Sequence, residues 1–148
     1  MKTFNFSSEQ WLPNPLEEVF PFFADARNLE QLTPDWLSFT VLTPEPIPMA
    51  AGTTIDYRLA WHGIPLRWRS EIAAWEPPHR FVDRQLRGPY RLWHHEHRFF
   101  EVDGGTRVTD QVDYAVWGGA LALRFGVRRD IERIFEFRRT RLIEIFGG

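Results

Sequence analysis

The 148-residue sequence contains no cysteine, which excludes disulfide scaffolds, cysteine-ligated zinc and thiol nucleophiles. It also lacks any apolar run long enough to span a membrane, and its first residues, MKTFNFSSEQW, do not contain the apolar core of a signal peptide. Neither sign of charge is in clear excess: the formal net charge is −2, so no long-range field attracts nucleic acid. These absences predict a cytoplasmic protein without a nucleic-acid partner and without stable membrane insertion.

Aromatic residues, by contrast, are abundant and are spread over the whole sequence. They make up 16% of the residues and include seven tryptophans. Large rings fill a hydrophobic core, but they also line pockets that hold apolar ligands. The length is that of one domain, and no repeat, low-complexity stretch or linker interrupts the sequence. We therefore expect a single domain over residues 1–148.

The hydrophobic periodicity changes along the chain in a way that predicts an α+β fold. An alternating start is followed by helical spacing, then by a long region of period two, and finally by helical spacing again. The expected strands cover 3–11, 36–42, the two arms of a hairpin over 52–75, 80–88, 91–102 and 106–117. The first expected helix has Asn14 as its cap and Pro15 as its first residue, and two others cover about 25–33 and about 127–146. The final helix is the only expected element long enough to cover one face of such an antiparallel sheet.

Alternation along the strands assigns side chains to the two faces of the expected sheet. In the 52–75 hairpin, Tyr57 and Trp68 share the face that must meet the helix. The Asp-Gly-Gly turn at 103–105 places odd positions of 91–102 on the same face as even positions of 106–117. In the strands from 80 onward, the expected inner face carries Asp83, Gln85, Trp93, His95, His97, Phe99, Asp110 and Tyr114. His94 falls on the opposite, solvated face.

The expected inner face is not purely apolar. His95, His97 and Asp110 need hydrogen-bond partners or water there, since an unpaired buried polar group costs about 1–3 kcal/mol. Arg138 falls in the middle of the apolar stripe of the final helix, and a buried arginine must meet a carboxylate, a water molecule or a ligand. Several such groups on one face predict a hydrated or polar-tipped cavity between the sheet and the helix.

Five segments resemble the START-like, or SRPBCC, helix-grip superfamily, which includes lipid carriers and polyketide cyclase/dehydrase-like proteins. They are LPNPLEEVFPFFADARNLEQLTPDWL (12–37), GIPLRWRSEI (63–72), PPHRFVDRQLRGPYRLWHHEHRF (77–99), GGTRVTD (104–110) and IFEFRR (134–139). The resemblance implies a curved seven-stranded antiparallel sheet, two short helices after the first strand, and a long C-terminal helix over the sheet with a cavity between them. It transfers no catalytic motif to this sequence.

The favoured function is the binding of a small hydrophobic or amphipathic molecule in that cavity, without a cofactor. The apolar part of the ligand would lie against aromatic rings, and its polar end would meet the histidines, carboxylates and arginine. The residues expected to contact it are Tyr57, Trp68, Asp83, Gln85, Trp93, His95, His97, Phe99, Asp110, Tyr114 and Arg138.

Three alternatives stay open at this point, so the sequence does not decide whether the protein is an enzyme. The first is a cyclase/dehydrase-type enzyme for a polyketide-like substrate, with His97 and Asp110 as a general base and Arg138 stabilising an enolate. The second is a metal site of His95, His97 and Asp110, because His-x-His places two imidazoles on one face of a strand. The third is a module that binds a partner protein and has a collapsed cavity.

Overall fold

The computed structural model describes residues 2–117 and 121–147, and for residues 121–125 it describes the backbone only. In chain order the elements are β1 (Phe4–Leu12), α1 (Leu16–Phe23), the 3-10 helices η1 (Ala26–Glu30) and η2 (Asp35–Leu37), β2 (Thr40–Val41), β3 (Thr54–Trp61), β4 (Ile64–Glu76), β5 (Arg80–Arg87), β6 (Leu92–Val102), β7 (Gly105–Ala115) and α2 (Leu121–Phe146). Within the described residues, the strands form one seven-stranded sheet in the order β1-β7-β6-β5-β4-β3-β2.

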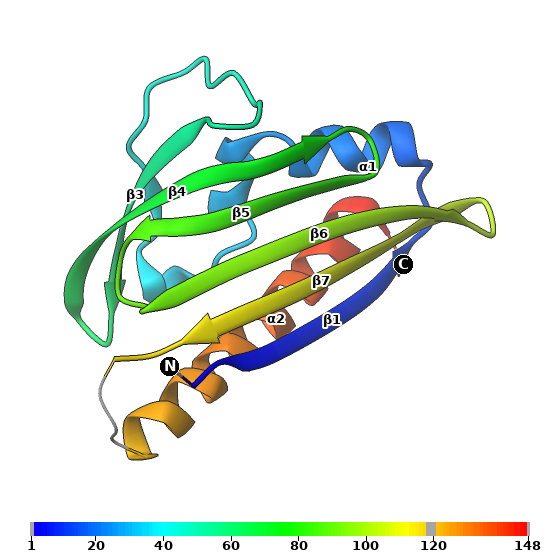
Figure 1. Cartoon of the computed structure of the whole chain (residues 1–148). Coiled ribbons are helices and arrows are strands. Elements are labelled where there is room, and N and C mark those ends of the chain that lie inside the picture. The colour runs from blue at the N-terminus through cyan, green and yellow to red at the C-terminus, as the bar shows by residue number, and fades with distance from the viewer. Residues whose placement is uncertain (1, 118–120, 148) are drawn as a thin grey trace.

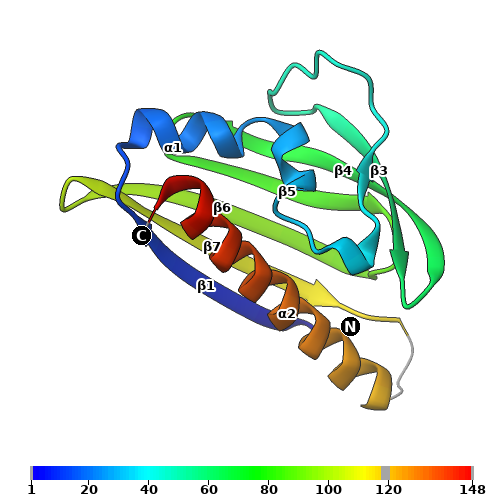
Figure 2. The ribbon, with the colours of Figure 1, turned by 180° about the vertical axis from the view of Figure 1, so that it is seen from behind.

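The sheet is curved, and its inner face is covered by helices from both ends of the chain. Neighbouring strands are antiparallel throughout. The long helix α2 lies obliquely across the inner face, and α1 with the segment that follows it lies beside α2 on the same side (Figures 1 and 2). This arrangement confirms the expected α+β helix-grip fold.

Two tight turns set the strand register on which the site depends. At the β6–β7 turn Asp103 and Gly104 both have positive φ, at 52° and 76°, and at the β3–β4 turn His62 and Gly63 do as well, at 48° and 81°. Two consecutive residues with positive φ form the turn that matches the twist of a two-residue hairpin. In the resulting register His97 lies directly opposite Asp110. The faces predicted from alternation are therefore confirmed for β6 and β7.

The region between α1 and β3 differs from the sequence-based expectation. The expected helix over about 25–33 is replaced by η1, and η2 occupies the first residues of the expected 36–42 strand. Pro34 precedes η2, and Ser38 ends it in the left-handed region at φ 46°. Strand pairing is therefore delayed until Thr40, which lies opposite Arg58. The final helix is longer than expected, since it begins at Leu121.

The hydrophobic core is divided into three clusters. One joins α1 to the sheet near Phe81 and Phe99, a second lies against β3 and β4 around Ile55, and a third packs α2 onto β7 around Val112 and Ile131. Among the described residues, no helix combines the length and the apolar character needed to cross a bilayer. Because α2 contributes to two of the clusters, its packing holds the covering layer on the sheet.

Truncating Leu142 tests the contribution of α2 to the core. Leu142 is 2% exposed, whereas the neighbouring Ile143 is 44% exposed. We expect Leu142→Ala to lower the free energy of unfolding by about 2–5 kcal/mol, because it removes buried methyl groups and leaves a cavity. Ile143→Ala, the matched control, should change it by less than about 0.5 kcal/mol. Urea denaturation measures both values, and equal losses in the two variants would contradict this packing.

Candidate functional site

A cavity of about 300 Å³ lies between the inner face of the sheet, α2 and the segment that contains η1 and η2. This volume is at the lower end of the range for pockets that bind small molecules. Its walls are mainly apolar, and the polar side chains among the lining residues include Ser70, Asp83, His95, His97 and Arg138. The presence of this cavity counts against the alternative of a collapsed interior.

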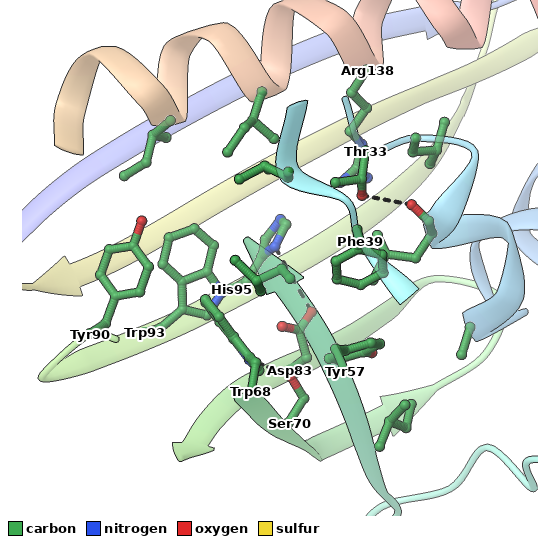
Figure 3. Close-up of a pocket in the computed structure, with 18 of the residues that line it drawn as sticks. Thr33, Phe39, Tyr57, Trp68, Ser70, Asp83, Tyr90, Trp93, His95 and Arg138 are labelled. Atoms are coloured by element: carbon green, nitrogen blue, oxygen red, sulfur yellow. Dashed lines mark hydrogen bonds and ion pairs between the residues drawn. The ribbon is translucent and has the colours of Figure 1, made fainter. Parts of the chain in front are cut away.

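Three aromatic rings form one wall of the cavity. The ring centroids of Trp68 and Trp93 are 5.5 Å apart, those of Trp68 and Tyr90 are 5.6 Å apart, and those of Tyr90 and Trp93 are 4.8 Å apart. The indole N–H of Trp68 donates to Ser70 Oγ at 2.9 Å, which fixes the ring against β4. Burial raises the pKa of Tyr90 above its ordinary value, so its hydroxyl stays uncharged. The wall therefore offers an uncharged aromatic surface (Figure 3).

A polar cluster lies beside this wall, and Asp110 of β7 is at its centre. Oδ1 of Asp110 is 2.8 Å from His95 Nε2 and 3.4 Å from His97 Nδ1, both on β6. The same oxygen is 3.3 Å from Nη2 of Arg138, which extends from α2 toward the sheet. Asp110 is 7% exposed and lies behind the cavity wall rather than in it. One carboxylate thus connects two strands and the covering helix.

The second carboxylate of the cluster, Asp83 on β5, faces the cavity. Its Oδ2 is 2.6 Å from His97 Nε2 and 3.9 Å from His95 Nδ1. The side chain of Asp83 is 21% exposed, whereas those of both histidines are 7% exposed. Because Asp83 lines the cavity, this exposure is toward the cavity (Figure 3). A ligand in the cavity would therefore contact Asp83 directly.

The two histidines are stacked but have different proton affinities. Their ring centroids are 3.7 Å apart, and the other face of His97 stacks on Phe81 at 4.0 Å. Burial and the charge of His97 lower the pKa of His95 below its ordinary value. Burial also disfavours the charge on His97, but the carboxylates of Asp110 and Asp83 outweigh it and raise the pKa of His97. His97 therefore binds a proton more readily than His95 does.

Both carboxylates are ionised, and this determines the orientation of the hydrogen bonds. Burial alone would raise the pKa of Asp110, but Arg138 and the histidines hold it well below its ordinary value, and His97 and His95 lower that of Asp83. An ionised carboxylate only accepts hydrogen bonds, so Nε2 of His95 donates to Asp110. Because His95 is neutral, its Nδ1 has a free lone pair and can accept a hydrogen bond or a proton.

Most of the side chains predicted from the sequence reach the cavity, but four do not. The seven that line it are Tyr57, Trp68, Asp83, Trp93, His95, His97 and Arg138. Asp110 lies behind the histidines, and Phe99 and Tyr114 are each 1% exposed within the core clusters. Gln85, expected to face the ligand, instead bonds the backbone of Tyr90 through both side-chain atoms, at 2.8 and 3.0 Å. Its role is to hold the bend between β5 and β6.

Sequence reasoning missed other lining residues, among them Tyr90 and Asp130. Tyr90 follows Gly88 and Pro89 in an irregular bend, so no periodicity assigns it to a face. Asp130 is eight positions before Arg138 on α2, and this helical spacing was a usable signal for the same face. Its Oδ2 accepts from Trp61 Nε1 at 2.7 Å and is 2.9 Å from His62 Nε2, which ties α2 to the β3–β4 hairpin.

The histidines also belong to a group with the composition of a metal site. One ligand atom from each of Asp83, His95 and His97 lies within 4.8 Å of the others. Asp83 thus takes the place that the sequence reasoning gave to Asp110. The 2.6 Å between His97 Nε2 and Asp83 Oδ2 is a hydrogen-bond distance. Two ligands of one tetrahedral zinc would be about 3.3 Å apart, so the observed geometry fits the hydrogen-bonded network rather than a formed metal centre.

The chain resembles known structures over nearly its full length. A Zhui aromatase/cyclase from a Streptomyces species has a TM-score of 0.74 at 16% identity, covering 97% of this chain and 93% of that chain. Protein Ms6760 from Mycobacterium smegmatis has a TM-score of 0.70 at 20% identity, covering 95% and 89%. Ara h 8.0201 has a TM-score of 0.67 at 14% identity, covering 97% and 99%. At these identities the likeness establishes the fold alone.

The family assignment comes from the sequence itself. No curated protein matches the chain at a significant level. Residues 12–137 match the family model described as polyketide cyclase/dehydrase and lipid transport. That match extends from the end of β1 through most of α2, and it confirms the helix-grip resemblance. The chain therefore belongs to the polyketide cyclase/dehydrase and lipid transport family.

Proposed function

We propose that the protein binds a small hydrophobic or amphipathic molecule in the cavity between the sheet and α2. The observation that carries this proposal is a void of about 300 Å³ whose walls are mainly apolar and which the cluster of Asp83, His95, His97 and Arg138 lines on one side. Protein interiors are normally packed with few voids larger than a water molecule, so a cavity of this size suits an occupant. The family description, which includes lipid transport, supports the same proposal.

The arrangement of side chains gives the ligand an orientation. Its apolar part lies against Trp68, Tyr90 and Trp93, where aromatic rings provide a large contact area. Its polar end meets Asp83 and His95, the members of the cluster that combine cavity lining with a free acceptor. A few polar groups in a mainly apolar pocket fix the orientation of a ligand in this way.

A larger side chain that fills the cavity should weaken the binding of an apolar probe. Ile134 lines the cavity from α2, whereas Phe137 of the same helix is 36% exposed. We expect Ile134→Trp to weaken binding of N-phenyl-1-naphthylamine, an uncharged fluorescent probe for apolar sites, by at least about tenfold, because the larger ring occupies the void. The control Phe137→Trp should bind as the wild type does. Unchanged affinity in a folded Ile134→Trp protein would place the binding site elsewhere.

A second candidate function, a cyclase or dehydrase, is favoured by the pairing of His95 with Asp110. A neutral imidazole in the cavity, oriented by a buried carboxylate 2.8 Å away, is the arrangement of a general base. His95 suits this role better than the His97 proposed from the sequence. The pKa of His97 is raised, so it binds a proton more readily than His95, and its ring is enclosed between Phe81 and His95. This proposal requires His95 Nδ1 to reach an acidic proton of the substrate.

Turnover distinguishes the enzyme from the carrier. If the protein is a dehydrase, a β-hydroxyketone incubated with it loses one water molecule, which mass spectrometry detects. We expect Asp110→Asn to lower this rate by at least about 100-fold, because the carboxylate no longer orients and supports the base. Asp113→Asn, on the opposite face of β7, serves as the control and should retain the rate. Binding without any loss of water would leave the carrier as the function.

The division of the proton between the histidines is a separate test of the site. In a pH titration followed by NMR of the imidazole resonances, His97 should titrate above the ordinary histidine value and His95 below it. Burial acts against protonation of both rings, but His97 is paired with both Asp83 and Asp110, whereas His95 is hydrogen-bonded only to Asp110 and is repelled by the charge of His97. The opposite order would remove His95 as the neutral acceptor in the cavity.

A further inference from the structure

The charged side chains that line the cavity are mainly acidic. Asp25, Asp83 and Asp130 are among the lining residues, and within the described part of the chain Arg138 is the only lysine or arginine that joins them. The protein as a whole is close to neutral, so this imbalance belongs to the cavity rather than to the composition. Asp25 is exposed and Asp130 is already bonded to Trp61 and His62, so the negative charge that a buried ligand meets comes mainly from Asp83.

The single arginine of the lining is already compensated. Nη2 of Arg138 is 3.3 Å from Oδ1 of Asp110, and both side chains are less than a tenth exposed. The guanidinium also lies over the rings of Phe23 and Phe135, at 5.2 and 5.5 Å. A ligand anion placed against Arg138 would compete with Asp110 and would also lie near Asp83. Arg138 can donate a hydrogen bond to a ligand, but it does not supply an uncompensated positive charge.

The histidines do not reverse this balance at neutral pH. Their rings are stacked at 3.7 Å, so a second proton on the pair would place two positive charges in contact. Two carboxylates therefore face one guanidinium and at most one imidazolium. The cluster is electroneutral when His97 is protonated and negative when it is not. An added carboxylate would have no free positive partner in a buried site, and an unpaired buried charge is costly.

The hydrogen-bonding groups of the cluster suit a hydroxyl. Asp83 uses Oδ2 for His97 and is partly exposed to the cavity, and His95 Nδ1 is a further acceptor. Arg138, which also lines the cavity, is a donor in the same cluster. A hydroxyl group donates one hydrogen bond and accepts others, so it satisfies both kinds of partner without adding charge.

We infer that the cavity selects ligands whose polar end is an uncharged hydroxyl and rejects the carboxylate of the same chain length. This inference deepens the proposed function and depends on it. It names the ligand class as neutral amphiphiles with a hydrogen-bonding end, and it excludes free fatty acids as preferred ligands.

The test compares three decyl compounds on the wild-type protein at pH 7.5, each displacing N-phenyl-1-naphthylamine. We expect 1-decanol to bind at least about tenfold more tightly than decanoate, because only decanoate brings an uncompensated charge. Methyl decanoate, which keeps both oxygens but carries no charge, should bind closer to decanol than to decanoate. Decanoate binding as tightly as decanol would overturn the inference while leaving the ligand cavity in place. Methyl decanoate binding as weakly as decanoate would overturn the assignment of the preference to charge.

A variant pair assigns the selectivity to the cluster. Asp83→Asn removes one negative charge from the cavity wall, so the preference for decanol over decanoate should fall at least about threefold. Asp56→Asn removes the same charge from the opposite face of the sheet, where Asp56 pairs with Arg69, and should leave the preference unchanged. An equal effect of both variants would contradict the assignment to Asp83. If none of the three compounds displaces the probe, the proposed function fails together with the inference.

Discussion

The contact of three cationic or donor groups with the carboxylate of Asp110 is the interaction on which the site depends. Asp110 connects β7 to β6 through His95 and His97, and to α2 through Arg138. Burying such charges costs several kcal/mol per ion, and apolar residues of similar volume are often as stabilising. Stability alone therefore does not account for the cluster. The cluster lies at the edge of the cavity, with Asp83 exposed to the interior, which is where the proposed ligand would meet it.

The cavity exists because the core is divided rather than continuous. Separate apolar clusters hold α1, the β3–β4 hairpin and α2 in place, and the space between them is walled by aromatic rings and the polar cluster. The tie between Asp130 and Trp61 adds a polar connection between α2 and the β3–β4 hairpin. Because one fold can host different functions, the proposed function rests on the charge and hydrogen bonding of these particular side chains.

The fold and much of the site were predictable from local patterns. Alternation and the Asp103-Gly104 turn correctly placed His95, His97 and Asp110 on one face, because strand pairing in a tight hairpin leaves little freedom of register. The helical angle of Arg138 correctly predicted a buried partner. The predictions failed where the chain is irregular. In the segment with η1 and η2, Pro34 and the left-handed conformation of Ser38 determine the backbone path. The side chain of Gln85 forms a hydrogen bond with the backbone of Tyr90 instead of facing the cavity.

The sequence by itself determined the order of the elements, the face of each paired strand and the presence of polar groups on an apolar surface, because these depend on spacing along the chain. Only the tertiary structure decided which of these groups reach the cavity and which lie behind it. It also decided in which direction the pKa of each histidine is shifted. His95 and His97 are chemically identical, two positions apart and equally buried. His97 lies 2.6 Å and 3.4 Å from two carboxylates, whereas His95 is close only to Asp110, at 2.8 Å, with Asp83 3.9 Å away. Such differences arise from through-space electrostatics, which spacing along the chain does not encode.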